Sequence, residues 1–321
     1  MKKINVGIVG YGNLGKGVEK AIKQNPDMEL KAIFTRRDIK EIETKSLVVN
    51  IKDILDWQNK IDVLILCGGS ATDLPIQTPE LVRHFNTVDS YDTHAKIPEY
   101  FAEVNKNATE TLGLISVGWD PGLFSMMRLL FETLLPESHT ESFWGPGVSQ
   151  GHSDAIRRIE GVIGAVQYTI PRAEAIEAME DGEIDLTTRE KHLRECYVAI
   201  EAEAKKEEIE NAIKTMPDYF ADYDTIVNFV TLTELKEKHS GMPHGGTVLT
   251  KGITGSGSKQ LMKFNLELAS NPEFTASVIT AYARAVVKLY REGKRGAISI
   301  YDVPLSYISP EDNESLRKRL L

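Results

Sequence analysis

The sequence predicts an α/β protein of two domains, a doubly wound parallel sheet followed by an α+β domain with a mostly antiparallel sheet. Three observations carry this prediction. Apolar β-branched runs alternate with helical stretches over residues 4–117, the first run ends in a glycine-rich turn, and the strands expected after residue 121 alternate between apolar and polar positions. The chain has 321 residues, which is ample for two domains with a sizeable core in each.

The first strand, expected over residues 4–9, leads directly into the turn Gly10-Tyr11-Gly12-Asn13-Leu14-Gly15 and a helix over 13–24. In a Rossmann-type fold the first glycine of such a turn permits the tight bend, the second lets the backbone approach a pyrophosphate, and the third lets helix and strand pack closely. The positive end of the helix dipole also favours phosphate here. We therefore expect a dinucleotide site; a turn that merely joins strand to helix is the simpler alternative.

The second strand, expected over residues 30–35, ends in Thr35-Arg36-Arg37. This position lies roughly twenty residues past the glycines, where an NAD site normally places an acidic residue on the ribose hydroxyls. An arginine fork matches a phosphate bidentately, whereas a carboxylate would repel it. The expected cofactor is therefore NADP(H) and not NAD(H), with a solvated loop as the alternative interpretation of the two arginines.

The rest of the parallel sheet is expected from strands near residues 46–49, 63–67, 86–89 and 113–117, with helices before residue 86 and over 97–111. Ligands of such sheets bind at the carboxyl ends of the strands. Three of these ends are Cys67-Gly68-Gly69-Ser70, Asp89-Ser90-Tyr91-Asp92 and Gly118-Trp119-Asp120-Pro121-Gly122. Carboxylates at two of them, Asp92 and Asp120, suit a substrate ammonium and its proton, although each alone is more often a cap or turn residue.

The second domain is expected from strands with period-two alternation, clearest over residues 262–268. Further strands are expected over 141–144, 166–170, 195–201, 225–232 and 246–250, and solvated helices over 172–185 and 205–214. An apolar-faced helix over 276–290 is expected to return to the first domain. The expected domains are therefore 1–118 with 270–321 for the dinucleotide, and 119–269 for substrate binding and dimerisation.

Polar and aromatic residues are concentrated in three segments of this second domain. In residues 143–154, Trp144 is a candidate pocket wall, and Gln150 and the Gly151 amide are candidate donors to a carboxylate. Arg194, at the start of an expected strand, is a candidate clamp for a second carboxylate. His244 lies between a proline and two glycines, which favours a ligand loop. The simpler alternatives are a core tryptophan and a solvent-facing arginine.

Composition argues against several classes of protein. The net charge of -9 disfavours nucleic acid or an anionic membrane as a partner, and no apolar run is long enough to span a bilayer. The two cysteines, Cys67 and Cys196, lie far apart in apolar contexts and indicate buried thiols in a reducing compartment, so a cytoplasmic location is expected. No spacing suggests a metal site, and no nucleophile-elbow motif supports hydrolysis.

Taken together, the motifs resemble the meso-diaminopimelate D-dehydrogenase family nearly from end to end. They are GYGNLG, the Thr35-Arg36-Arg37 strand end, CGGSATD (67–73), VDSYDTH (88–94), GWDPG (118–122), FWGPGVSQGHSDAIRR (143–158), MPDYF (216–220) and GMPHGG (241–246). The resemblance implies reversible, NADP-dependent oxidative deamination of the D-centre of meso-2,6-diaminopimelate. The products would be L-2-amino-6-oxopimelate, which cyclises to tetrahydrodipicolinate, ammonia and NADPH. It also implies a cytoplasmic homodimer that serves lysine biosynthesis.

The resemblance also implies roles for individual residues. Asp92 and Asp120 would contact the reacting end of the amino acid. The pocket would be lined by Trp119, Trp144, Gln150, Gly151 and Asp154. Substrate polar groups would be held by Thr169, Arg194 and His244, at the distal carboxylate, and by Asn271, for which the end is left open. The cofactor would contact Gly10, Tyr11, Gly12, Asn13, Leu14, Thr35, Arg36, Arg37, Cys67, Gly68, Gly69, Ser70, Ala71, Thr72, Ser90, Tyr91, Asp92, Pro121 and Gly122.

Two alternatives to this function remain open from the sequence. One is another NADP-dependent reductase of the same two-domain build, acting on dihydrodipicolinate, aspartate or homoserine. The other is a non-catalytic NADPH sensor, which would bind the cofactor without turnover.

Overall fold

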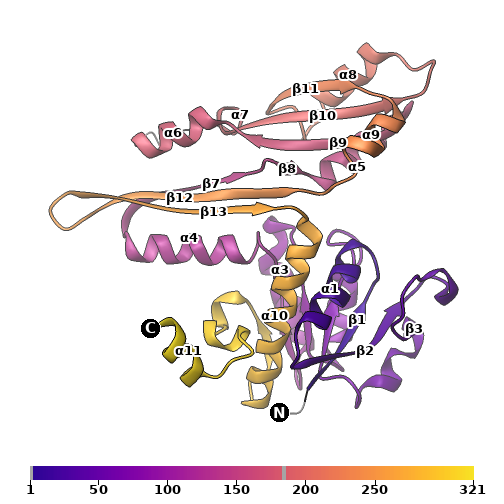
Figure 1. Ribbon diagram of the computed structural model, residues 1–321, viewed down its shortest axis with the longest axis vertical. Coiled ribbons are helices and arrows are strands. Elements are labelled where there is room, and N and C mark those ends of the chain that lie inside the picture. Colours follow the sequence, from indigo (N-terminus) through magenta and orange to yellow (C-terminus); the bar gives the residue numbers. More distant parts are fainter. Residues whose placement is uncertain (1–2, 183–185) are drawn as a thin grey trace. The chain divides into compact units, whose positions relative to one another are not determined.

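The computed structural model describes residues 3–182 and 186–321, and the chain divides into two compact units (Figure 1). The first unit consists of Met1–Met126 and Pro272–Leu321, and the second of Met127–Asn271. Among the helices of the described residues, none combines the length and the apolar character that a membrane crossing requires.

The first unit is built on a seven-stranded sheet in which all paired strands are parallel. In spatial order the strands are β14 (Gly296–Ile298), β6 (Leu112–Leu114), β5 (Thr87–Asp89), β4 (Val63–Leu66), β1 (Ile4–Val9), β2 (Met28–Thr35) and β3 (Val48–Asn50). Along β4, Val63 and Ile65 join one apolar cluster, whereas Leu64 and Leu66 join another. Because both faces of the sheet are buried, its strands are continuous apolar runs. The Rossmann-type fold class is confirmed.

Helices supply the two apolar layers of this unit. They are α1 (Asn13–Gln24), α2 (Leu74–Leu81), α3 (Ile97–Asn107), the start of α4 (Leu123–Leu134) and α10 (Asn271–Arg291). The last helix, α11 (Asn313–Leu320), has no buried residue. The α10 residues Ile279 and Val286 are wholly buried in the same cluster as Ile8 of β1. A Cβ on Gly17 would lie 2.8 Å from the Cβ of Ala276, so α1 and α10 pack closely. The C-terminal segment therefore contributes both a helix and the edge strand β14 to this unit.

The region after α3 differs from the sequence prediction. The helix ends at Asn107 and not at residue 111, and β6 covers Leu112–Leu114 in place of 113–117. The Thr111 hydroxyl donates to the Val82 carbonyl, and the Asn86 side chain accepts the Leu112 N–H at 3.0 Å. These long-range hydrogen bonds compete with those that would continue the helix, so the helix ends before Thr111. A local sequence pattern does not show this competition.

The second unit contains two sheets. One has the order β11 (Asp224–Phe229), β10 (His192–Ile200), β9 (Val162–Pro171), β8 (Gly147–Val148), and the other has the order β13 (Ser258–Leu268), β12 (His244–Thr254), β7 (Glu137–Trp144). Every pair is antiparallel except β10 with β11, which confirms a mostly antiparallel domain. The helices are α5 (Gln150–Arg157), α6 (Ala173–Asp181), α7 (Thr188–Lys191), α8 (Lys206–Lys214) and α9 (Leu232–Lys238). The long β12–β13 hairpin is visible in Figure 1.

Two expected elements of this unit end earlier than the sequence suggests. The strand expected over 225–232 ends at Phe229, because the Thr231 side chain accepts the Glu234 N–H and caps α9. The helix expected over 172–185 ends at Asp181, and Gly182 follows in a left-handed conformation with φ of 110°. The last three residues of that expected helix, 183–185, lie outside the described residues.

Candidate active site

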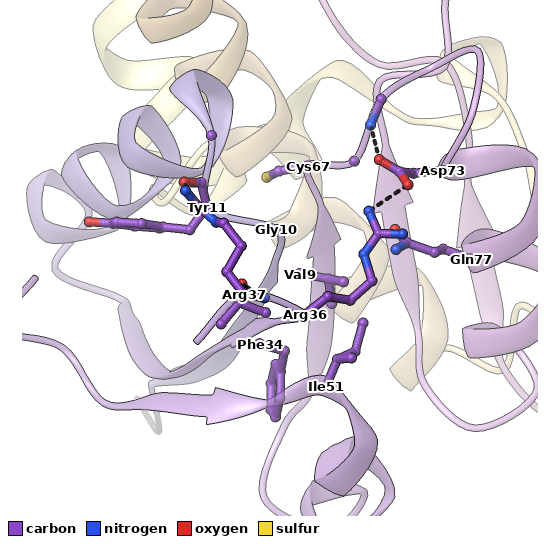
Figure 2. Close-up of a pocket in the computed structure, with 14 residues that line it drawn as sticks. Val9, Gly10, Tyr11, Phe34, Arg36, Arg37, Ile51, Cys67, Asp73 and Gln77 are labelled. Carbon is purple, nitrogen blue, oxygen red and sulfur yellow. Dashed lines mark hydrogen bonds and ion pairs between the residues drawn. The ribbon is translucent and has the colours of Figure 1, made fainter. Parts of the chain in front are cut away.

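A cavity of about 290 Å³ lies beside the glycine turn, at the carboxyl ends of β1, β2 and β4 (Figure 2). Nine of the expected cofactor residues line it: Gly10, Tyr11, Gly12, Thr35, Arg36, Arg37, Cys67, Gly68 and Gly69. It is also lined by Val9, Phe34, Ile51, Asp73 and Gln77, which the sequence analysis did not single out.

The three glycines of the turn have different local geometries. Gly10 has a φ of +89°, which an L side chain rarely adopts. A Cβ on Gly15 would lie 2.3 Å from the Gly10 carbonyl oxygen, so helix and strand approach closely there. A Cβ on Gly12 would meet nothing within 4 Å, and no side chain caps the N-terminus of α1. A phosphate therefore has both space and backbone donors at this point.

The Tyr11 side chain is fixed by a buried carboxylate. Its hydroxyl donates to Glu19, which also accepts hydrogen bonds from Lys23, Thr44 and Ser46. Burial raises the pKa of Glu19, but these hydrogen bonds outweigh it and lower the pKa to about 2. The Tyr11 carbonyl in turn accepts a hydrogen bond from Arg37, so the arginine is anchored to the glycine turn.

The neighbouring arginine, Arg36, forms an ion pair with Asp73, with 2.7 Å between the guanidinium nitrogen and the carboxylate oxygen (Figure 2). Asp73 also accepts the Gly69 N–H at 2.9 Å, so this pair links the end of β2 to the loop after β4. The Thr35 hydroxyl accepts the Arg37 N–H at 3.1 Å and holds the turn that presents both arginines. The structure thus brings Thr35, Arg36 and Arg37 to one cavity, together with a carboxylate.

One further cavity residue, Gln77, has a buried amide oxygen with no hydrogen-bond partner among the described residues. Buried polar atoms normally have partners, so this acceptor suits a ligand donor. Nothing in the local sequence pattern marks Gln77, whereas Asp73 is the last residue of the CGGSATD motif.

The remaining expected cofactor residues follow the same edge of the sheet without lining the cavity. Asn13 and Leu14 form the first turn of α1, and Ala71 and Thr72 precede α2. Ser70 accepts the Asp92 N–H at 2.8 Å, which ties the loop after β4 to the segment Ser90-Tyr91-Asp92 after β5.

The segment 118–122, which contains Pro121, is a tightly closed turn. Gly122 has a φ of +131°, and a Cβ there would lie 1.9 Å from the Gly118 carbonyl oxygen. Trp119 is buried and meets the Phe124 ring edge-to-face, with ring centroids 5.1 Å apart. Asp120 is half-buried at the tip of this turn, and Asp92 is exposed.

A buried arginine is the centre of the candidate site in the second unit. Strand pairing places Gly147, Thr169, Arg194 and Thr225 in one row across β8, β9, β10 and β11. In the described part of the chain, Arg194 donates to the Thr169 hydroxyl, and its guanidinium lies 3.9 Å from the centroid of the Tyr223 ring. Its Nε is buried and has no hydrogen-bond partner within residues 3–182 and 186–321. A buried cation held by a hydroxyl and a ring suits an anionic ligand.

Three histidines respond to this charge. Burial, followed by the charge of Arg194, lowers the pKa of His152 and of His192 to about 4. Burial lowers the pKa of His244 as well, and Arg194 adds to the effect. All three histidines are therefore neutral at pH 7. The positive charge at this point of the second unit comes from Arg194.

His244 has a defined orientation. Its Nδ1 lies against the main chain of Gly245, 2.8 Å from the nitrogen and 3.1 Å from the carbonyl oxygen, and this contact fixes the ring. A Cβ on Gly147 would lie 2.4 Å from the His244 Cα, so His244 packs directly on the strand that pairs with Thr169. The structure thus brings Thr169, Arg194 and His244 together.

Three other expected residues lie around the same segments. The Trp144 ring stacks on His192, with centroids 5.5 Å apart, and is about a third exposed, at 38%. Gln150 Nε2 lies 3.2 Å from the Met242 sulfur, and the Asn271 N–H donates to the Met242 carbonyl at 2.9 Å.

Gly151 and Asp154 both belong to α5. A Cβ on Gly151 would meet nothing within 4 Å. Asp154 forms an ion pair with Arg157 of the same helix, a contact that sequence reasoning did not foresee. In the described residues, no group of three or more histidine, cysteine, aspartate or glutamate side chains could hold a metal ion.

The fold and site define a class of protein, a dinucleotide-dependent oxidoreductase with a separate α+β unit that contains a buried arginine. Residues 118–270 match the family model of the diaminopimelic acid dehydrogenase C-terminal domain. The chain is 56% identical over 326 residues to the meso-diaminopimelate D-dehydrogenase of Ureibacillus thermosphaericus, with 100% of both chains covered. The chain belongs to the meso-diaminopimelate D-dehydrogenase family.

Two solved structures are similar over the full length. One is the Corynebacterium glutamicum diaminopimelate (DAP) dehydrogenase in complex with DAP, at 45% identity and a TM-score of 0.94, with 100% of each chain covered. The other is an engineered D-amino acid dehydrogenase bound to NADP+, at 43% identity and a TM-score of 0.89, again with 100% of each chain covered.

Proposed function

We propose that the protein catalyses the reversible, NADP-dependent oxidative deamination of the D-centre of meso-2,6-diaminopimelate, in lysine biosynthesis. The products are L-2-amino-6-oxopimelate, ammonia and NADPH. The observation that carries this proposal is Arg194, a buried guanidinium that lies among a hydroxyl, an aromatic ring and three neutral histidines. Support also comes from the relatives, one named for this activity and one solved with DAP.

The residues beside the glycine turn fit NADP. Gly12 leaves space at the start of α1, Arg36 and Arg37 provide two guanidinium groups for a 2′-phosphate, and Gln77 offers an unpaired acceptor. The proposed contacts are residues 10–14, 35–37, 67–72, 90–92 and 121–122. Residues 1–118 with 270–321 form the proposed dinucleotide-binding domain. When bound, NADP+ supplies the hydride acceptor for the D-carbon.

The substrate carries two carboxylates and two ammonium groups, so its pocket needs both signs of charge. Arg194, Thr169 and His244 hold the distal carboxylate. Asp92 and Asp120 hold the ammonium of the reacting centre and orient the D-carbon for hydride transfer, after which water hydrolyses the imine. The proposed walls of the pocket are Trp119, Trp144, Gln150, Gly151 and Asp154, and Asn271 binds a further polar group.

Selectivity for diaminopimelate follows from the buried polar groups. A simple D-amino acid lacks the distal carboxylate and would leave Arg194 buried and unpaired. Each unpaired buried group costs about 1–3 kcal/mol, and more if it is charged. The substrate that satisfies Arg194 is therefore preferred.

We propose further that the enzyme is a cytoplasmic homodimer, and that residues 119–269 contain the dimerisation surface. Leu129, Leu130 and Leu134 of α4 are each about half exposed, at 49%, 46% and 55%, which suits a protein interface. The two free cysteines suit a reducing compartment. Sedimentation at micromolar concentration tests the dimer, and the mass of a monomer would contradict it.

An assay of NADP+ reduction with the stereoisomers of diaminopimelate tests the function. Turnover is expected with the meso isomer and none with the LL isomer, which has no D-centre. A non-catalytic sensor would bind NADPH without turnover of either isomer. A reductase of the same two-domain build but another substrate would leave meso-diaminopimelate unchanged and act on dihydrodipicolinate, aspartate or homoserine.

Arg36→Ala and Arg37→Ala are each expected to weaken NADPH binding about tenfold or more, because each removes a charge-assisted hydrogen bond to phosphate. NADH binding should change little, since NADH lacks the 2′-phosphate. Fluorescence titration of both nucleotides measures this, with Arg317→Ala on the exposed face of α11 as a matched control. Unchanged NADPH affinity in both cavity variants would refute the 2′-phosphate site.

A further inference from the structure

Asp89 is a wholly buried carboxylate, at 0% exposure, that has no part in the chemistry proposed above. It is the last residue of β5 and lies at the carboxyl edge of the parallel sheet. Its side chain accepts four hydrogen bonds, and all four donors are uncharged hydroxyl or backbone N–H groups. Among the described residues, no lysine, arginine or histidine donates a hydrogen bond to it.

The two oxygens of Asp89 have different partners. Oδ1 accepts the backbone N–H groups of Tyr91 and Ser116, each at 3.0 Å. Oδ2 accepts the hydroxyls of Thr78 on α2, at 3.0 Å, and of Tyr100 on α3, at 2.6 Å. One oxygen therefore joins two loops, and the other is held in place by two helices.

The two loops joined by Oδ1 are the ones that carry the proposed catalytic carboxylates. Tyr91 directly precedes Asp92, and Ser116 begins the segment that leads to Asp120. The backbone carbonyl of Asp89 also accepts the Val117 N–H at 2.8 Å, which gives the second loop two attachments to the same residue.

Ser116 has a backbone conformation that needs such an attachment. Its φ is 58°, in the left-handed region that L residues other than glycine rarely adopt. Its own hydroxyl is buried and finds no hydrogen-bond partner in the part of the chain that the structure describes, so no side-chain hydrogen bond stabilises this conformation. The hydrogen bonds from the Ser116 and Val117 N–H groups to Asp89 hold the backbone on either side of it.

The ring of Tyr91 is fixed by the same cluster. It stacks on Tyr100, with centroids 4.1 Å apart and an interplanar angle of 25°, while the Tyr100 hydroxyl donates to Asp89. Burial raises the pKa of the Asp89 carboxyl, and the four hydrogen bonds act in the opposite direction.

We propose that Asp89 is a positioning residue that fixes the backbones of both loops, and with them the orientation of Asp92 and Asp120 toward the reacting centre. This inference rests on the proposed function for its catalytic consequence. The structural consequence, which is the attachment of the two loops to one oxygen, does not depend on it.

Two variants separate positioning from charge. Asp89→Ala removes both acceptors and releases the loops. Asp89→Asn keeps an oxygen that can accept both backbone N–H groups, and its amide can donate to the Thr78 and Tyr100 hydroxyl oxygens. Asp89→Leu, of similar size and without an acceptor, replaces the alanine variant if that protein does not fold. Thr78→Val is the matched control, because it removes one donor to Oδ2 and leaves Oδ1 unchanged.

Turnover is measured as kcat per folded molecule, with sites counted by NADPH titration. We expect about a thirtyfold loss or more in Asp89→Ala, since misplaced reacting groups have effects of that order, and near wild-type turnover in Asp89→Asn and Thr78→Val. A lowered melting temperature with unchanged kcat in Asp89→Ala would overturn the inference, because the role would then be only structural. An equal loss of kcat in Asp89→Asn would also overturn it.

Amide hydrogen exchange of peptides that cover residues 88–93 and 114–120 provides a readout independent of turnover. Faster exchange in both peptides of Asp89→Ala, restored in Asp89→Asn, supports the attachment, and unchanged exchange refutes it. A wild-type protein inactive on meso-diaminopimelate would refute the proposed function, while the exchange rates would still decide whether Asp89 fixes the loops.

Discussion

Arg194→Gln is expected to lower kcat/KM for meso-diaminopimelate by about a hundredfold or more and to leave the NADPH dissociation constant nearly unchanged. The variant removes a buried charge that we propose to pair with the distal carboxylate, and hydrogen bonds to charged groups contribute about 1.5–3 kcal/mol each. Steady-state kinetics and nucleotide titration measure the two effects. Arg189→Gln is the matched control, because Arg189 is exposed and pairs with Asp224.

The same variant has a second expected effect, on the neighbouring histidines. The charge of Arg194 lowers the pKa of His152 and His192, so its removal should raise both from about 4 toward the ordinary value, though not fully, since burial persists. NMR titration of the imidazole signals measures this. Unchanged kcat/KM would refute the role of Arg194 in substrate binding, and unchanged histidine pKa values would refute its electrostatic influence.

Asp120→Asn is expected to lower kcat about a hundredfold or more with little change in NADPH affinity. Asparagine keeps the size of the side chain but loses the charge that holds the substrate ammonium and the capacity to accept its proton, a role for which about 10²–10⁴-fold effects are typical. Stopped-flow measurement of NADP+ reduction separates the chemical step from cofactor binding. Asp56→Asn, at an exposed aspartate of the first unit, is the control. Equal losses of kcat and NADPH affinity would contradict the assigned role.

Much of the first unit could be predicted because its signals are local. The glycine turn depends on backbone conformation at Gly10 and on close packing at Gly15. Both requirements select glycine within a few consecutive residues, so the turn is recognisable from the local sequence. The arginines at the end of β2 are likewise adjacent to the strand that presents them. The fully buried β4 is a continuous apolar run, and such runs are recognisable without an alignment.

The missed residues share a different physical origin. Tyr223 meets Arg194 from a segment about thirty residues away in sequence, and Asp73 meets Arg36 across the cavity. Periodicity reports which face of an element is buried, but not which distant side chain lies opposite it. Arg194 itself illustrates the limit, because its position at the start of a strand suggested a solvent-facing residue as readily as the buried cation that the structure contains.

The ion pair between Arg36 and Asp73 has a consequence for how the cavity discriminates between nucleotides. Arg36 already has an anionic partner, so the arrival of a 2′-phosphate is an anion exchange and not the capture of an anion by an empty cation. A nucleotide with only a ribose hydroxyl offers nothing to exchange and would leave Asp73 in place beside it. Cofactor preference at this position then depends on the competition between two anions, the Asp73 carboxylate and the 2′-phosphate, for one guanidinium.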